Sequence, residues 1–152
     1  MEFITVEQFQ EQPLKVQKTF LDWWKPEIGD IFQFATVDFD NDDSTIGVIS
    51  GKKQIKIAEW GKGEYRIPLF TEGQLRKFIE YKKGKIVEIN LFCGGYSIVT
   101  AYRKCEFDSL GKDLLQAYWE VACKIAEENL REDILIGCIK QSLEEATKDE
   151  NK

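Results

Sequence analysis

The spacing of hydrophobic residues ahead of Pro26 predicts two short helices. Thr5 and Gln8 match the Thr-x-x-Gln pattern of a capping box, in which each side chain bonds the other residue's main-chain N–H. The first helix is expected to end near Gln12, because proline disfavours helical geometry in the residue before it. Pro13 then fits the first turn of a second helix, which ends before Pro26. The apolar stripe predicted for this second helix comprises Leu14, Phe20, Leu21 and Trp24, with Val16 and Trp23 on its flanks.

After Pro26 the pattern changes from helical spacing to alternation, which is typical of strands. The three strands predicted from it cover residues 31–39, 45–50 and 54–60. Because only short polar or glycine-containing segments separate them, they are expected to form an antiparallel meander. Residues 64–70 are also expected to be extended, and Pro68 favours the edge of a sheet for them, since proline cannot donate to a ladder.

The second half of the chain predicts a helix, a hairpin and further helices. Thr71 and Gln74 repeat the capping-box pattern, and the helix that follows is expected to end at Gly84. The buried stripe expected on it is Leu75, Phe78 and Ile79. Strands over residues 85–92 and 96–105 flank a Cys-Gly-Gly turn. A long amphipathic helix is marked by Leu114, Leu115, Tyr118, Val121, Ala122, Ile125 and Ala126, and a further segment by Ile134, Leu135, Cys138, Ile139 and Leu143.

These elements predict an α+β fold. Residues 1–147 are expected to form a single domain, with N-terminal helices, one central helix and long C-terminal helices on a mostly antiparallel sheet of about five strands. Residues 148–152 are expected to fray. The apolar stripe of the C-terminal segment adds to an already complete unit, so a homodimer through the C-terminal helices is an alternative that the sequence leaves open.

Composition narrows the classes of function. The chain has 152 residues and no histidine, which removes the commonest general base and the commonest zinc ligand. No set of nucleophile, base and oxyanion donor emerges, so we expect no enzyme, no cofactor and no metal site. Four cysteines without a C-x-x-C pair indicate free, buried thiols. Short apolar runs and an acidic start without a signal pattern lead us to expect a cytoplasmic protein outside the membrane.

The net charge of −6 conceals one basic segment. Residues 51–85 hold ten bases and four acids, whereas residues 1–50 hold ten acids and three bases. Lys56, Lys62 and Arg66, interleaved with Tyr65, resemble a stacking surface with cationic edges, such as a nucleotide or single-stranded nucleic acid would use. The alternative is that these lysines line turns and an edge strand, where they discourage aggregation. Arg76, Lys77, Lys82 and Lys83 add charge on the helix that follows, where they form a candidate patch for an acidic partner.

An acidic loop at residues 38–44 suggests calcium at first sight. Asp38, Asp40 and Asp42 have the 1, 3, 5 spacing of an EF-hand loop, and Asp43 follows them. The loop lacks both the glycine and the bidentate glutamate that such a site needs, so a solvated turn is favoured over a metal site.

The adjacent Trp23 and Trp24 raise a question about surfaces. Neighbours on a helix lie about 100° apart, so two indoles cannot share one buried stripe. Trp24 is expected to pack inward with Phe20, and Trp23 to be half-covered or exposed. The sequence leaves open whether Trp23 belongs to the rim of the core or to a contact surface.

Three blocks of the sequence, residues 16–32, 67–80 and 113–128, resemble a group of small uncharacterised proteins of phages and prophages of Gram-positive bacteria. The resemblance implies an accessory protein that acts inside the host cell by binding host proteins, including defence systems such as CRISPR nucleases, or by sequestering nucleotide signals. It assigns no functional residue.

The leading hypothesis is a non-enzymatic protein that binds a host macromolecule, most simply a host protein. Its expected contact residues are Trp23, Trp60, Tyr65, Asp38, Asp40, Asp42 and Asp43. The alternative is a module that binds a nucleotide or single-stranded nucleic acid through segment 52–66. Its expected ligand-binding residues are Lys56, Lys62, Tyr65 and Arg66.

Overall fold

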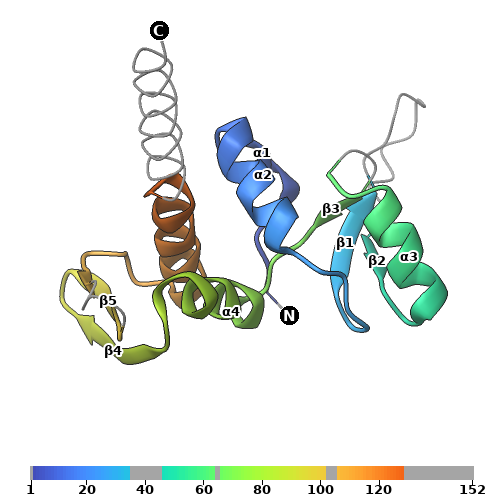
Figure 1. The fold of residues 1–152 in the computed structure, drawn as a ribbon. Coiled ribbons are helices and arrows are strands. Elements are labelled where there is room, and N and C mark those ends of the chain that lie inside the picture. Colours follow the sequence, from blue (N-terminus) through green and yellow to red (C-terminus); the bar gives the residue numbers. More distant parts are fainter. Residues whose placement is uncertain (1, 35–45, 64–65, 102–105, 129–152) are drawn as a thin grey trace, which may run out of the picture.

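The computed structural model describes residues 2–34, 46–63, 66–101 and 106–128 (Figure 1). The helices in these ranges are α1 (Val6–Gln10), α2 (Leu14–Trp23), α3 (Lys52–Trp60), α4 (Glu72–Lys83) and a fifth over residues 114–128. The strands are β1 (Ile31–Phe34), β2 (Ile46–Val48), β3 (Arg66–Pro68), β4 (Ile86–Phe92), β5 (Gly95–Thr100) and β6 (Glu106–Phe107). The predicted α+β class is confirmed.

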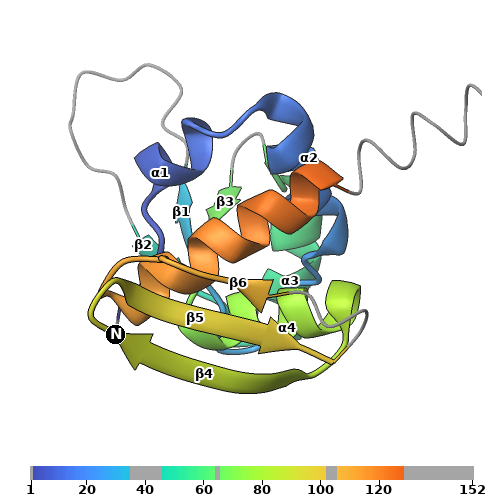
Figure 2. The same ribbon diagram turned by 90° about the vertical axis from the view of Figure 1, so that its left-hand side faces the viewer.

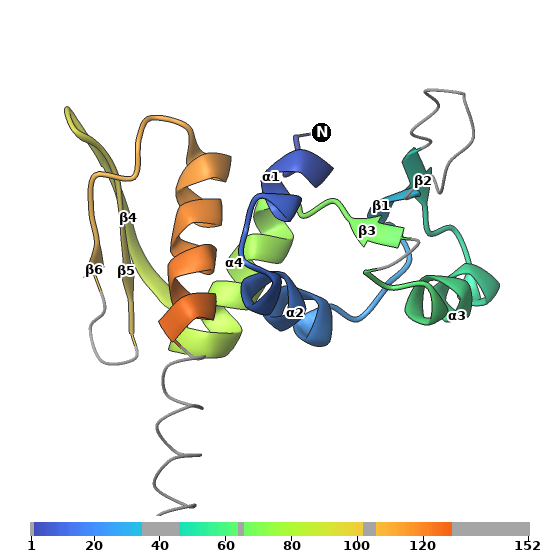
Figure 3. The same ribbon diagram turned by 90° about the horizontal axis from the view of Figure 1, so that it is seen from above.

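The strands form two separate sheets, where the sequence predicted one sheet of about five strands. Within the described residues each sheet has three antiparallel strands, in the orders β2-β1-β3 and β4-β5-β6. Figure 3 shows that the helix over residues 114–128 and the helices α4, α1 and α2 lie between them. The β4-β5-β6 sheet covers one side of this helical layer, and the β2-β1-β3 sheet with α3 lies beyond the other.

A cluster of aromatic rings joins the helical layer. Phe20 of α2 lies at its centre, with ring centroids 4.6 Å from Phe78, 5.1 Å from Trp119 and 5.4 Å from Phe70. Phe9 of α1 completes the cluster at 6.4 Å. Four of the helices and the segment before α4 therefore meet at the buried Phe20 side chain. Aromatic rings of this size supply much of the burial energy of a core.

The short helices begin where the sequence predicted. Thr5 and Gln8 form the capping box of α1, with the Thr5 N–H donating to Gln8 Oε1 and the Gln8 N–H to Thr5 Oγ1. Thr71 and Gln74 do the same for α4, which ends at Gly84 with φ +77°. The predicted stripe of α4 is fully buried, as are most residues of the stripe predicted for residues 114–126. These predictions are confirmed.

The stripe predicted for α2 is wrong at Leu14. This side chain is 81% exposed, whereas Val16, Phe20 and Trp24 are buried. Residues four apart lie on the same helix face, so burial of Val16 and Phe20 turns Leu14, two positions before Val16, toward solvent.

The prediction of a strand over residues 54–60 is also wrong, because α3 occupies them. Ile55 and Ile57 alternate with polar residues as in a strand, yet the positions that pack on the core are the partly buried Ile55 and the buried Ala58, which are three residues apart. Lys, Gln, Ala and Glu are good helix formers, and Ile57 remains 48% exposed. The third strand of this sheet is instead β3, which pairs with β1 and places Pro68 at the predicted edge.

The hairpin of β4 and β5 is confirmed, with a two-residue turn at Cys93 and Gly94. The predicted first strand is confirmed over residues 31–34, and β2 lies within the second. The remaining part of the first strand, the C-terminal segment around residues 134–143 and the expected frayed end fall outside the described residues.

Candidate binding cleft between α2 and α4

The segment that follows α2 is anchored by the carboxylate of Asp30. Asp30 Oδ2 accepts hydrogen bonds from Trp24 Nε1 at 2.9 Å and from the Glu27 N–H at 3.0 Å. Asp30 Oδ1 accepts from Gln74 Nε2 at 2.9 Å. Because Gln74 Oε1 accepts from the Thr71 N–H in the capping box, the same amide caps α4 and holds Asp30. The end of α2 is thus fixed to the start of α4.

A cleft of about 570 Å³ opens beside this anchor. The residues that line it are Thr19, Asp22, Trp23, Trp24, Lys25, Glu27, Asp30, Gln74, Lys77, Tyr81 and Lys82. Its size lies in the range of ligand sites, and it is formed by two helices and the segment between α2 and β1.

Two aromatic side chains give the cleft its apolar surface. Trp23 is half-buried and packs edge to face on Phe78, with ring centroids 5.2 Å apart. Tyr81 is 72% exposed, and the Lys82 ammonium lies 5.6 Å from its ring centroid. Trp23 is therefore held by the core on one side and is open to the cleft on the other.

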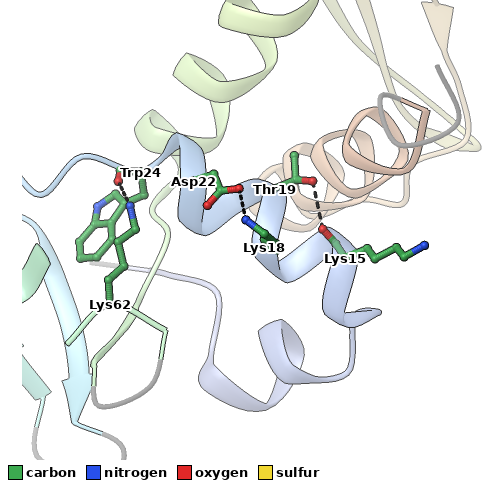
Figure 4. A network of polar contacts seen from close by, with 6 residues as sticks. All are labelled: Lys15, Lys18, Thr19, Asp22, Trp24 and Lys62. Carbon is green, nitrogen blue, oxygen red and sulfur yellow. Dashed lines mark hydrogen bonds and ion pairs between the residues drawn. The ribbon is translucent and has the colours of Figure 1, made fainter. Parts of the chain in front are cut away.

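The charged side chains that line the cleft differ in whether they have a bonding partner in the described part of the chain. Asp22 pairs with Lys18 at 2.7 Å, as Figure 4 shows, and Asp30 already accepts three hydrogen bonds. Within the described residues, no ion pair involves Lys25, Lys77 or Lys82. The cleft thus combines an apolar wall with ammonium groups that lack a carboxylate partner in the described part of the chain.

Two residues of the basic segment, Lys62 and Arg66, bond to main-chain oxygens of this chain. Lys62 Nζ donates to the Trp24 main-chain oxygen at 2.8 Å (Figure 4), and partial burial lowers the pKa of Lys62 although Asp22 and Glu59 oppose this shift. Arg66 Nη1 donates to the Ile57 oxygen at 3.1 Å, and its guanidinium lies 5.3 Å from the Phe34 ring centroid.

Two of the three cations predicted to bind a ligand therefore bond within the chain. Lys56 is exposed on α3, and Trp60 is 81% exposed at the end of that helix. Neither residue lines the cleft. Tyr65, Asp38, Asp40, Asp42 and Asp43 fall outside the described residues.

The sequence prediction included Trp23, and it pointed to Lys77 and Lys82 as part of a patch for an acidic partner, but it missed Tyr81 and Asp30. Tyr81 looks like an ordinary position of an amphipathic helix, and Asp30 like a turn residue. The signal that was present is Gln74, because its capping role fixes where its amide points. Only the packing of α2 beside α4 brings these residues together.

In the described part of the chain, no group of three or more cysteine or carboxylate side chains could hold a metal ion. Burial raises the pKa of the Cys123 thiol, with Glu127 and Glu120 adding to the effect, which disfavours the reactive thiolate. Cys93 and Cys123 are both free thiols, and Cys93 is exposed at the hairpin turn, contrary to the expectation of buried cysteines.

None of the helices in the described ranges has the length and apolar character needed to cross a membrane. No protein-family model, curated protein or solved structure matches this chain.

Proposed function

We propose that this chain is a non-enzymatic accessory protein that binds a host protein in the cleft between α2 and α4. The observation that carries the proposal is the pairing of Trp23 and Tyr81 with lysines that have no carboxylate partner among the described residues. Aromatic side chains with flanking cations are typical of contact surfaces for acidic partners. The resemblance to phage and prophage proteins supports a cytoplasmic host partner, of which a defence nuclease is one candidate.

The partner that this cleft suits is an acidic protein segment with at least one apolar side chain. The apolar side chain would contact Trp23, and carboxylates spaced along the segment would reach Lys25, Lys77 and Lys82. Charges spread along a peptide can approach these lysines while they avoid Asp22 and Glu27 on the same walls.

A nucleotide fits the same cleft less well. The carbonyl end of α2 lies at Trp23, and the C-terminal end of a helix disfavours an anion. A phosphate group also concentrates its charge near Asp22 and Glu27. The nucleotide or single-stranded nucleic-acid alternative through segment 52–66 stays a prediction, with Lys62 and Arg66 engaged inside the chain.

The test compares variants in an affinity pull-down from host lysate treated with nuclease. Lys77→Glu reverses a charge in the cleft and Tyr81→Ala removes its exposed ring, so each is expected to reduce capture of the retained protein about tenfold or more. Tyr81 is preferred to Trp23 because Trp23 also packs on Phe78.

Lys52→Glu is the matched control, since Lys52 is an exposed lysine of α3 outside the cleft. Equal capture by Lys77→Glu and wild type, or equal loss in Lys52→Glu, would contradict the cleft as the binding site. Loss of all captured material on nuclease treatment would instead favour the nucleic-acid alternative.

A further inference from the structure

An apolar edge of the β4-β5-β6 sheet is separate from the cleft. Figure 2 shows β4 as the outermost strand of this sheet, with β5 on its inner side. Large apolar side chains of β4 are exposed, among them Ile89 at 37% and Leu91 at 58%. Within β4, Glu88 is the only charged residue, and there is no proline or lysine. Residues 89–92 thus carry none of the charges, prolines or bulges that commonly protect an edge from pairing, since Glu88 and the bulge beside it lie at the other end of the strand.

The main-chain groups of Ile89 and Leu91 point to the side of β4 that has no strand partner among the described residues. Leu91 lies opposite Tyr96, and Ile89 opposite Ile98. The Tyr96 N–H donates to the Gly111 oxygen, and the Tyr96 oxygen accepts from the Leu110 N–H, so both groups point away from β4. In an antiparallel pair the two residues turn their groups either toward each other or both outward. Leu91 and, two residues earlier, Ile89 therefore present an outward donor and acceptor.

We propose that a second copy of this chain adds to β4 in antiparallel orientation, with the two-fold axis at Asn90. In this register Ile89 lies opposite Leu91 of the second copy, and Leu91 opposite Ile89. The four outward donors and acceptors on each strand would then form about four inter-chain hydrogen bonds. The two β4-β5-β6 sheets would join into one continuous sheet.

A second copy is the favoured occupant because the strand complements itself in this register. Ile89 and Leu91 oppose each other on both sides of the axis, and the Asn90 amide opposes its own counterpart. Glu88 lies opposite Phe92, so the two carboxylates fall at opposite ends of the pairing. A two-fold axis at Ile89 would pair Leu91 with Val87, where the ladder with β5 is interrupted by a bulge. A two-fold axis at Leu91 would pair Ile89 with Cys93, which lies in the hairpin turn. The axis at Asn90 avoids both irregular positions.

A cysteine placed on the two-fold axis tests this register. Asn90 and its counterpart would form a pair without main-chain hydrogen bonds, with Cα atoms about 4.5 Å apart, a distance that a disulfide spans. In a Cys93→Ser background, Asn90→Cys is expected to form a covalent dimer on mild oxidation, seen on a non-reducing gel.

Glu88→Cys in the same background is the matched control, because Glu88 and Asn90 share a face of the strand. The two Glu88 positions would be four residues apart along the pairing, roughly 13 Å, which is too far for a disulfide. Equal cross-linking of both variants, or none in Asn90→Cys, would overturn the proposal.

The mass in solution tests the interface without a cross-link. Light scattering after size exclusion is expected to give a dimer for the wild type and a monomer for Leu91→Lys, since lysine on an edge strand opposes pairing. Leu14→Lys, an equally polar change at an exposed leucine of α2, is expected to remain dimeric. A monomeric wild type, or a Leu91→Lys dimer, would overturn the proposal, and the second result would favour the C-terminal helices as the dimer interface.

Discussion

At the scale of single residues, the two adjacent tryptophans have different roles because the helix ends between them. Trp23 is the last residue of α2, and Trp24 has extended backbone geometry with ψ +121°. Trp24 is 1% exposed, and its indole N–H is satisfied by Asp30. Trp23 packs on Phe78 at the rim of the core and lines the cleft. Trp24 is therefore a core residue, whereas Trp23 lies at the rim of the core and also lines the cleft.

Replacement of Asp30 by alanine is expected to lower the free energy of unfolding by about 2–4 kcal/mol. The change removes one acceptor atom from Gln74 and another from Trp24 and Glu27, and it leaves the buried Trp24 indole N–H without a partner. Urea denaturation followed by circular dichroism measures the effect.

Asp22→Ala is the control for Asp30→Ala, because its ion pair with Lys18 is exposed. Exposed pairs contribute less than about 1 kcal/mol. An equal loss of stability in the two variants would show that the Asp30 hydrogen bonds stabilise the fold no more than the exposed ion pair of Asp22 does.

At the scale of elements, the hairpin depends on one close approach between main chains. Gly95 has φ +121°, and a Cβ built on it would lie 2.5 Å from the Gly111 main-chain oxygen. Tyr96 bonds this same oxygen at 2.7 Å. The absence of a side chain at Gly95 therefore lets the segment before the fifth helix lie against the start of β5.

Gly95→Ala is expected to destabilise the protein by about 2 kcal/mol or more, because it adds a clash with main chain to a strained backbone conformation. Gly94→Ala is the matched variant one residue earlier, where an added Cβ meets nothing within 4 Å. It is expected to change stability by less than about 1 kcal/mol. Thermal unfolding of both variants measures the difference, and similar melting temperatures would contradict the role given to Gly95.

At the scale of the whole molecule, the helix over residues 114–128 connects the β4-β5-β6 sheet to the aromatic cluster. Trp119 stacks on Phe20, and Lys83 of α4 pairs with Glu128 at 2.8 Å. Burial on this helix raises the pKa of the Cys123 thiol and of the Tyr118 hydroxyl above their ordinary values of 9.0 and 10.0. Both groups therefore keep their protons in the folded chain at pH values where the unfolded chain loses them.

The stability of the molecule is consequently expected to fall as the pH rises above about 9, by about 1 kcal/mol per pH unit from Cys123. The sign follows because the unfolded chain then binds fewer protons than the folded chain. Urea denaturation at pH 8 and pH 10 measures the fall, and Cys123→Ala is expected to show a smaller one. The same fall in both proteins would assign the alkaline loss to other groups.

The cleft and the β4 edge differ in how far the sequence could predict them. Trp23 was predicted as a contact residue because two adjacent indoles cannot share one helix face, and it lines the cleft. Lys77 was predicted only as one of four charged residues in a patch for an acidic partner, and Tyr81 could not be identified, since its position on α4 carries no signal beyond amphipathic spacing. Ile89 and Leu91 were predicted to lie in a strand, but their exposure depends on which strand ends the sheet.

The sequence by itself determined the helix ends and the hairpin turn that depend only on residues close together in the chain. Capping boxes start α1 and α4, a glycine ends α4, and a two-residue turn closes the hairpin, because these features depend on hydrogen bonds and backbone angles within a few residues. Only the tertiary structure decided that residues 52–60 form a helix, that the strands divide into two sheets, and that α2 and α4 enclose a cleft. Alternating isoleucines suit either a strand or a helix, so the surface available for burial selects between them.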